Sequence, residues 1–161
     1  MSDIRQDPVK EALAYCFRLL TRRDYPLNAL RDRLVSRGYA RETVDDAAAR
    51  LIELRLVDDE SYVRRYVEHV LTRKPAGRAK VIRDLRHRGV EDELARRIVD
   101  EELTSDLEDA MARNALRGRG VDPDVLRADP KVAARHYRFL KGRGFPDGVI
   151  RRVMRDAEDS R

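Results

Sequence analysis

Three stretches of the sequence repeat one pattern: Leu34-Val-Ser-Arg37-Gly38-Tyr39, Leu85-Arg-His-Arg88-Gly89-Val90 and Leu140-Lys-Gly-Arg143-Gly144-Phe145. Each stretch reads Leu-x-x-Arg-Gly-apolar. A leucine that closes an apolar face, an arginine near the negative end of the helix dipole and a glycine free to turn left-handed together predict a helix end. The leucines lie 51 and then 55 residues apart, which leaves room for three helices of ordinary length. The pattern therefore predicts three tandem three-helix repeats.

The remaining helices of each repeat are predicted from start signals and apolar spacing. Helix starts precede the three helix ends at Asp7-Pro8, Asp58-Asp59 and Ser105-Asp-Leu-Glu108, and the last of these reads as a capping box. After each helix end, apolar residues return at helical spacing. We predict an all-α chain of nine helices in an elongated or curved array, with repeats over residues 8–57, 58–103 and 104–160.

One connection is unusually long. It runs over residues 119–129, contains Pro123 and ends in Asp129-Pro130, a further helix-start pair. We expect the third repeat to be hinged or differently set there. Residues 116–121 match the repeat pattern once more, and we interpret them as a coincidence or as a helix end.

The composition favours charged helices and gives no sign of a cofactor. Charged residues make up 40% of the 161 residues and aromatic residues only 6%, with a net charge of +5. Because no run of 18 apolar residues occurs, we expect no membrane segment and a soluble, cytoplasmic protein. The single cysteine, Cys16, lies on an apolar helical stripe and is predicted to be core. With three scattered histidines, no zinc spacing arises, so we expect neither metal nor cofactor.

Few residues are candidates for catalysis. His136 lies on an apolar face and is predicted to be packed in the core, whereas His69 and His87 are predicted to lie at the surface. Asp58 and Asp59 are of a residue type that binds metals, but adjacent helical residues point about 100° apart, and helix capping explains them better. The six tyrosines are better explained by core or boundary positions than by base stacking. We predict that the chain is not an enzyme.

The second and third repeats resemble a known family. The runs Val57-Asp58-Asp59-Glu60-Ser61-Tyr62, Gly77-Arg-Ala-Lys-Val-Ile-Arg-Asp-Leu85 and Tyr137-Arg-Phe-Leu140 are similar in order and spacing to RecX proteins, and the similarity extends over about residues 9–157. The chain departs from the family at Asp24-Tyr25-Pro26-Leu27, where an opening Ser with an acidic residue or Gln is usual, and at Val63, where Ala is common.

The resemblance implies a regulator without a cofactor. Such a protein binds RecA and the RecA–DNA filament along its helical groove, and modulates the ATPase, strand-exchange and co-protease functions of RecA, with inhibition the expected sign. Weak direct binding to single- or double-stranded DNA stays open, and we expect a monomer.

The charge pattern suggests where a partner binds. In the second and third repeats, basic residues gather on the helix that precedes the Arg-Gly turn and lie opposite its apolar stripe, whereas the first repeat shows no such face. We interpret these faces as a track for DNA phosphates or an acidic protein surface, the alternative being a solvated face with intrahelical ion pairs. The candidate binding residues are Arg73, Lys74, Arg78, Lys80, Arg83, Arg86, Arg88, Lys131, Arg135, Arg138, Lys141, Arg143 and Arg151.

Two other functions compete with this interpretation. The short glycine turn between the second and third helices of each repeat is typical of a helix-turn-helix, so the chain could bind DNA independently of RecA. The third helices of the first two repeats carry acids, however, which suit a phosphate-lined groove poorly. The chain could also be a helical adaptor for another protein, because repeated amphipathic helices alone establish architecture only.

Overall fold

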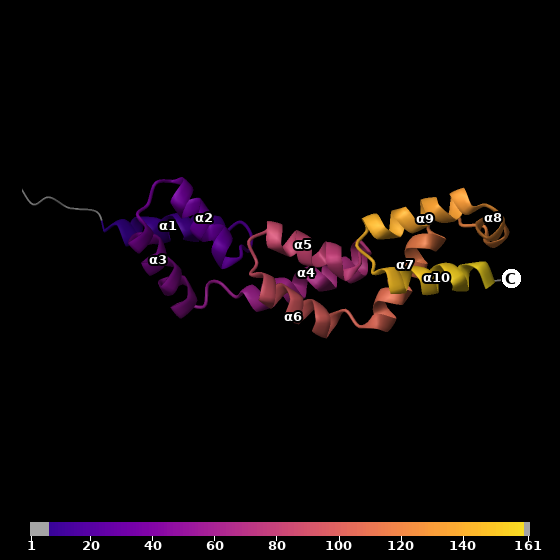
Figure 1. The fold of residues 1–161 in the computed structure, drawn as a ribbon. Helices are drawn as coiled ribbons and strands as arrows, with labels where there is room; N and C mark the ends of the chain where they lie inside the picture. The colour runs from indigo at the N-terminus through magenta and orange to yellow at the C-terminus, as the bar shows by residue number, and fades with distance from the viewer. Residues whose placement is uncertain (1–6, 160–161) are drawn as a thin grey trace, which may run out of the picture.

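The computed structural model describes residues 7–159, and every regular element within them is a helix (Figure 1). Repeat 1 comprises α1 (Pro8–Leu20), α2 (Leu27–Ser36) and α3 (Arg41–Glu53). Repeat 2 comprises α4 (Asp59–Arg73), α5 (Arg78–His87) and α6 (Asp92–Glu102). Repeat 3 comprises α7 (Ser105–Arg117), α8 (Pro123–Ala128), α9 (Pro130–Gly142) and α10 (Asp147–Asp159). The predicted all-α array is confirmed; residue 160, where we end the third repeat, lies outside the described residues.

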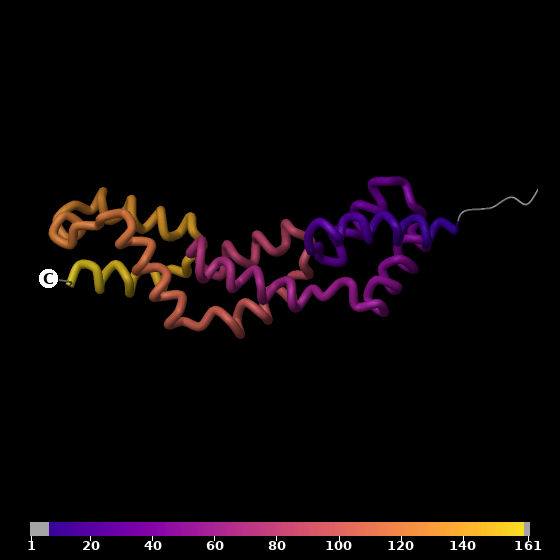
Figure 2. Tube along the Cα trace, turned by 180° about the vertical axis from the view of Figure 1, so that it is seen from behind, coloured from indigo at the N-terminus to yellow at the C-terminus, as the bar shows by residue number. Residues whose placement is uncertain are grey.

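The repeats follow one another along an elongated molecule whose two termini lie at opposite ends (Figures 1 and 2). Within each repeat, the last helix packs against the helices before it: α3 against α1 and α2, α6 against α4 and α5, and α10 against α7, α8 and α9. None of the helices in residues 7–159 is both long and apolar enough to cross a membrane.

The Leu-x-x-Arg-Gly stretches end helices as predicted. Gly38, Gly89 and Gly144 adopt the left-handed conformation, with φ of 88°, 94° and 83°. The apolar residue after each glycine donates its backbone N–H to the leucine carbonyl five residues earlier, at 3.2, 3.1 and 3.3 Å. This is the hydrogen bond of a Schellman helix end, and it turns the chain back toward the third helix of the repeat.

The expected break at residues 119–129 contains a tenth helix. Asp122 accepts hydrogen bonds from the backbone N–H groups of Asp124 and Val125, at 2.9 and 3.3 Å, and Pro123 occupies the first helical position of α8. The prediction of nine helices is therefore wrong, and the Asp-Pro start signal that we used elsewhere also operates at 122–123. Residues 116–121 are a helix end, because α7 stops at Arg117.

The capping box predicted at the start of α7 is wrong. Thr104 is the N-cap, and its hydroxyl accepts the backbone N–H of Leu107 at 3.4 Å. Glu108 does not fold back onto its own helix; its side chain is only 1% exposed and contacts Arg78 in repeat 2. A tertiary contact thus replaces the local one that the sequence pattern suggested.

Repeats 2 and 3 meet at a close backbone contact, which we call joint 2–3. The N–H of Gly77 donates to the carbonyl of Arg143 at 2.9 Å, and that of Ala79 to the carbonyl of Gly144 at 3.3 Å. A Cβ on Gly77 would lie 2.3 Å from the Gly144 carbonyl oxygen, so only glycine permits this approach. The Arg-Gly turn of repeat 3 therefore docks directly on the start of α5.

Repeats 1 and 2 meet in the same arrangement, which we call joint 1–2, but less tightly. The Arg-Gly turn of repeat 2 faces the start of α2, where a Cβ on Gly89 would lie 2.9 Å from the Ala29 nitrogen. Pro26 occupies the position that Gly77 holds in joint 2–3, and proline has no N–H to donate. The hydrogen bond from Gly77 therefore has no counterpart here, and Asn28, the equivalent of Ala79, donates no backbone hydrogen bond to the turn of repeat 2 within the described residues.

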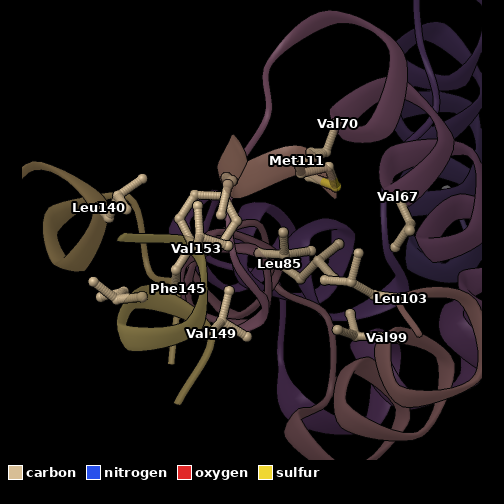
Figure 3. Close-up of a cluster of buried hydrophobic side chains, with 14 of the residues drawn as sticks. Val67, Val70, Leu85, Val99, Leu103, Met111, Leu140, Phe145, Val149 and Val153 are labelled. Carbon is tan, nitrogen blue, oxygen red and sulfur yellow. The ribbon is translucent and has the colours of Figure 1, made fainter. Parts of the chain in front are cut away.

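The cores follow the same division. One apolar cluster runs without interruption through repeats 2 and 3, and Figure 3 shows Leu85 of α5 near Phe145 and Val153 of repeat 3. A separate cluster fills repeat 1 and includes Cys16, whose burial confirms the core prediction. The connection at 119–129, where we expected the third repeat to be hinged or differently set, contains α8, and Leu126 of this helix is 2% exposed and belongs to the shared core. The core is interrupted at joint 1–2.

His136 is buried on α9, which confirms its predicted core position, while His69 and His87 are exposed as predicted. The Nδ1 atom of His136 has no hydrogen-bond partner among residues 7–159. Burial lowers the pKa of His136, and the nearby charges of Arg135 and Arg119 lower it further. The folded chain consequently takes up this proton less readily than the unfolded chain does.

This depressed pKa predicts a loss of stability in mild acid. The stability contribution of His136 is complete above the ordinary histidine pKa of about 6.5 and is lost as the pH falls through the lower folded value. We expect the free energy of unfolding, measured with urea, to fall between about pH 7.5 and about pH 5, and to fall less in His136→Leu. His87→Gln, at an exposed histidine, should keep the wild-type pH dependence; an unchanged pH dependence in His136→Leu would contradict the assignment.

Candidate partner-binding surface

Seven of the predicted binding residues lie between the end of α4 and the turn that follows α5, and they differ in what they contact. Arg73, Lys74 and Arg83 are exposed and form no ion pair with any residue of the described chain. Lys80 contacts Asp84 one turn later, with 2.7 Å between Nζ and Oδ2. The first three side chains are therefore fully available to a partner.

Arg78 has a structural role. Its Nε lies 2.9 Å from Oε2 of Glu108, its Nη1 lies 2.9 Å from Oδ1 of Asp100, and its Nη2 donates to the Leu103 carbonyl at 3.0 Å. All three guanidinium nitrogens are thus used within the protein. We therefore assign Arg78 to joint 2–3 and leave it out of the binding surface proposed below.

Arg86 and Arg88 end α5 in different ways. Arg86 forms an ion pair with Asp92 at 3.2 Å. Arg88 has no carboxylate partner in residues 7–159; its guanidinium lies over the Tyr66 ring, 4.8 Å from the centroid, and donates to the Tyr62 hydroxyl at 3.5 Å. Stacking fixes the guanidinium plane and leaves other N–H groups directed outward.

The basic residues of repeat 3 lie mainly along α9. Lys131, Arg135 and Arg138 are exposed and have no ion pair with the described residues, and the same holds for Arg151 on α10. Lys141 pairs with Asp147 at 2.8 Å. The hydrogen bond from Lys141 lowers the pKa of that carboxyl group, as does one from the Tyr137 hydroxyl, so the pair is charged at neutral pH.

Joint 2–3 brings predicted residues of both repeats to one cleft of about 570 Å³, which we call cleft 2–3. Arg143 crosses from repeat 3 and donates to the Pro75 carbonyl at 2.9 Å. The lining holds four basic side chains and no acidic one: Arg73, Lys74, Lys80 and Arg143, together with Pro75 and Ala76. A concave site of one charge sign concentrates the field on an anionic ligand.

A second cleft, of about 490 Å³, lies at joint 1–2 and includes residues that the sequence analysis did not identify. Arg23 and Arg33 of repeat 1 each stack on the Tyr25 ring, 4.6 and 5.0 Å from its centroid. Arg86, His87 and Arg88 face them from the end of α5. This cleft 1–2 also contains acids, Asp24 and Asp32, of which Asp24 pairs with Arg65 at 2.7 Å.

Repeat 1 brings Arg23 and Arg33 to cleft 1–2 together with Asp24 and Asp32, so the asymmetry that we inferred from the sequence stays a prediction. Arg23 and Arg33 are adjacent in sequence to Asp24 and Asp32, so a running charge count cancels them. The signal that could have found them is the neighbouring Tyr25, because arginine guanidinium groups commonly stack on the face of an aromatic ring.

Besides the exposed arginines that have no ion pair with the described residues, two further groups of arginines are distinguished by what they contact. One group pairs with carboxylates and holds the structure together, as Arg64 does with Glu60, Glu101 and Glu102. The other stacks on aromatic rings and forms no ion pair with a carboxylate of the described residues. Its members are Arg18, Arg23, Arg33, Arg37, Arg88, Arg119 and Arg143.

The adjacent acids Asp58 and Asp59 have capping roles. Within residues 7–159, no three side chains of His, Cys, Asp or Glu come together in a group that could hold a metal ion. Asp58 caps α4 by accepting the backbone N–H of Ser61 at 2.9 Å, as the capping prediction requires. Asp59 accepts the backbone N–H of Leu27 at 2.9 Å and so caps α2 of the preceding repeat.

The fold and the clefts define a helical-repeat protein with basic grooves at the joints between its repeats. Family models for the first and second three-helix domains of RecX match residues 12–51 and 58–98. Regulatory protein RecX of Thermus thermophilus is 36% identical over 149 residues, which are 92% of this chain and 94% of that protein. The chain belongs to the RecX family of regulatory proteins.

Other relatives and solved structures agree. Regulatory protein RecX of a Mycobacterium species is 32% identical over 148 residues, 90% of this chain and 80% of its own length. The crystal structure of RecX from Lactobacillus salivarius superposes with a TM-score of 0.83 over 96% of this chain and 99% of that one. Its sequence identity is 16%, so this likeness concerns the fold.

Proposed function

We propose that this chain binds the RecA nucleoprotein filament in the cytoplasm and lowers the ATPase, strand-exchange and co-protease activities of RecA without catalysing a reaction itself. Membership of a family of regulatory proteins supports a regulatory role. The observation that supports binding to an anionic partner is cleft 2–3, which has four basic side chains and no acidic one.

The contact surface that we propose follows the basic side chains of cleft 2–3 and the exposed cations near it in sequence that have no ion pair with the described residues. It combines cleft 2–3 with Arg83 on α5 and with Lys131, Arg135 and Arg138 on α9, and we name this set the basic track. Its side chains can contact DNA phosphates or carboxylates of the filament, and both interactions weaken with rising salt. An elongated molecule can contact several subunits of a helical filament at once, which strengthens binding without any single strong contact.

The proposal is tested by titrating the protein into RecA that hydrolyses ATP on single-stranded DNA. We expect the ATPase rate to fall at substoichiometric ratios of this protein to RecA. An unchanged rate at every ratio would disprove the function. Filament binding measured in parallel by fluorescence anisotropy of labelled DNA distinguishes a protein that fails to bind from one that binds without inhibiting.

Charge reversal tests the basic track. Arg83→Glu/Arg138→Glu should weaken filament binding at physiological salt by about tenfold or more, because two exposed cations become anions facing an anionic partner. Arg41→Glu/Arg50→Glu on α3 changes the net charge equally at exposed positions outside the track and serves as the control. Equal weakening by both variants would show that net charge, and not the track, determines binding.

An independent DNA-reading module is supported less well. The third helix of repeat 2, α6, would have to enter the major groove, yet it carries the exposed acids Glu93, Asp100 and Glu101. Tight, sequence-specific binding to duplex DNA in a gel-shift assay without RecA would favour this alternative. A helical adaptor for some other protein would leave RecA activity unchanged.

A further inference from the structure

Both joints between repeats use one docking mode. In each, the Arg-Gly turn of one repeat packs on the first turn of the second helix of the preceding repeat. A Cβ on Gly89 would approach the nitrogen of Ala29 to 2.9 Å, and a Cβ on Gly144 would approach the nitrogen of Lys80 to 2.4 Å. Ala29 and Lys80 are the third residues of α2 and α5, so the two contacts are equivalent.

A carboxylate completes each joint. The first residue of α2, Leu27, donates its backbone N–H to Asp59 at 2.9 Å, and the first residue of α5, Arg78, donates to Glu108 at 2.8 Å. Each acid lies among the first four residues of the next repeat's first helix. Neither α2 nor α5 has a side-chain cap of its own, so each helix start is capped by the following repeat.

Repeat 1 carries the same two parts, and nothing in the described chain covers them. Gly38 has φ of +88°, and a Cβ built there meets no atom within 4 Å. Glu11 is the fourth residue of α1, as Glu108 is the fourth residue of α7; it is exposed, and its side chain has no partner among residues 7–159. We name Glu11, Arg37, Gly38 and Tyr39 the end face.

A second copy of this chain does not supply the missing helix start. The equivalent helix of repeat 3 is α9, whose first residue is Pro130, which has no N–H to donate to Glu11. In addition, Asp129 already caps α9 by accepting the N–H of Lys131 at 2.8 Å. The start of α9 is thus unsuited to the Arg-Gly turn of another copy, and within residues 7–159 the docking face of repeat 1 stays uncovered.

We propose that the end face binds the first turn of an exposed α-helix on the partner protein, in the geometry of the two internal joints. Such a helix has a free N–H at its first position, which Glu11 accepts, and a positive dipole end that suits a carboxylate. Its third residue takes the place of Ala29 and Lys80, so that the Gly38 turn approaches the backbone nitrogen of that residue. This inference rests on the proposed function, because RecA filaments supply the helix.

The test uses Gly38→Asn in the full-length chain. Asparagine tolerates the left-handed conformation, and the open space at Gly38 accommodates its side chain in the free protein. A partner helix held as closely as Ala29 or Lys80 would clash with it. Gly120→Asn is the matched control, because Gly120 also has positive φ, +61°, and open space around it.

We expect Gly38→Asn and Gly120→Asn to have the same melting temperature within error. Gly38→Asn should bind RecA filaments on single-stranded DNA about tenfold more weakly than Gly120→Asn does. Glu11→Gln should also bind the filaments more weakly than the wild-type chain. Equal binding by Gly38→Asn and Gly120→Asn would overturn the inference while leaving the proposed function intact. If the wild-type chain fails to bind the filament, both are wrong. Sedimentation tests whether a second copy of the chain occupies the end face. A concentration-dependent dimer that Gly38→Asn abolishes would overturn the inference, because the end face would then bind a second copy and not a partner helix.

Discussion

Gly77→Ala should lower the free energy of unfolding by about 3 kcal/mol, the upper part of the range for inserting an atom into a closely packed contact. The added Cβ would lie 2.3 Å from the Gly144 carbonyl oxygen and 2.4 Å from Cα of Phe145. Both atoms are backbone, so no side-chain rotation can relieve the clash. The joint must open instead, with loss of the hydrogen bond from Gly77 to the Arg143 carbonyl.

Thermal unfolding followed by circular dichroism measures this effect, and for a chain of this length the melting temperature should fall by about 10 °C. Gly142→Ala is the control, because Gly142 is the last residue of α9 and a Cβ there meets nothing within 4 Å. Alanine at such a position should leave stability unchanged or raise it by about 0.5 kcal/mol. If Gly77→Ala and Gly142→Ala had the same melting temperature, the close contact at joint 2–3 would be refuted.

The parts of the fold that could be predicted are those that local sequence determines. A helix end needs only a leucine, a nearby arginine and a glycine in one turn, so Gly38, Gly89 and Gly144 were identifiable without any tertiary information. The helix start at Asp122 was equally local, and α8 could have been predicted from it. How one repeat meets the next depends instead on residues about 30 to 70 positions apart, for which one sequence contains no direct signal.

The arginines show why the site was harder to predict than the fold. Arg78 and Arg83 stand five positions apart on the same helix, yet Arg78 holds joint 2–3 and Arg83 has no ion pair in the described chain. Arg23 and Arg33, next to acids in sequence, line cleft 1–2. Charge along a chain thus locates basic segments, whereas the tertiary structure decides which cations a carboxylate neutralises.

Glu108→Ala should be the second most damaging substitution, with a loss of about 3 kcal/mol in the free energy of unfolding. The carboxylate is 1% exposed and accepts two hydrogen bonds from Arg78, one from the backbone N–H at 2.8 Å and one from Nε at 2.9 Å. Alanine removes both acceptors and leaves the start of α5 without a cap and a guanidinium without its buried partner.

Urea unfolding separates the capping part of this contact from the charge part. Glu108→Gln keeps one amide oxygen, which can accept the backbone N–H, and should recover about 1 kcal/mol relative to alanine. Glu11→Ala removes the exposed acid at the same helical position of α1 and should cost less than about 0.5 kcal/mol. Because Glu11 and Glu108 differ only in whether a neighbouring repeat covers them, equal losses in the two alanine variants would contradict the docking mode common to both joints. A large loss of unfolding free energy in Glu108→Ala and a small one in Glu11→Ala would support the docking mode. The glutamate at this helical position would then stabilise the fold where a helix start covers it, and would stay free for a partner where no helix start does.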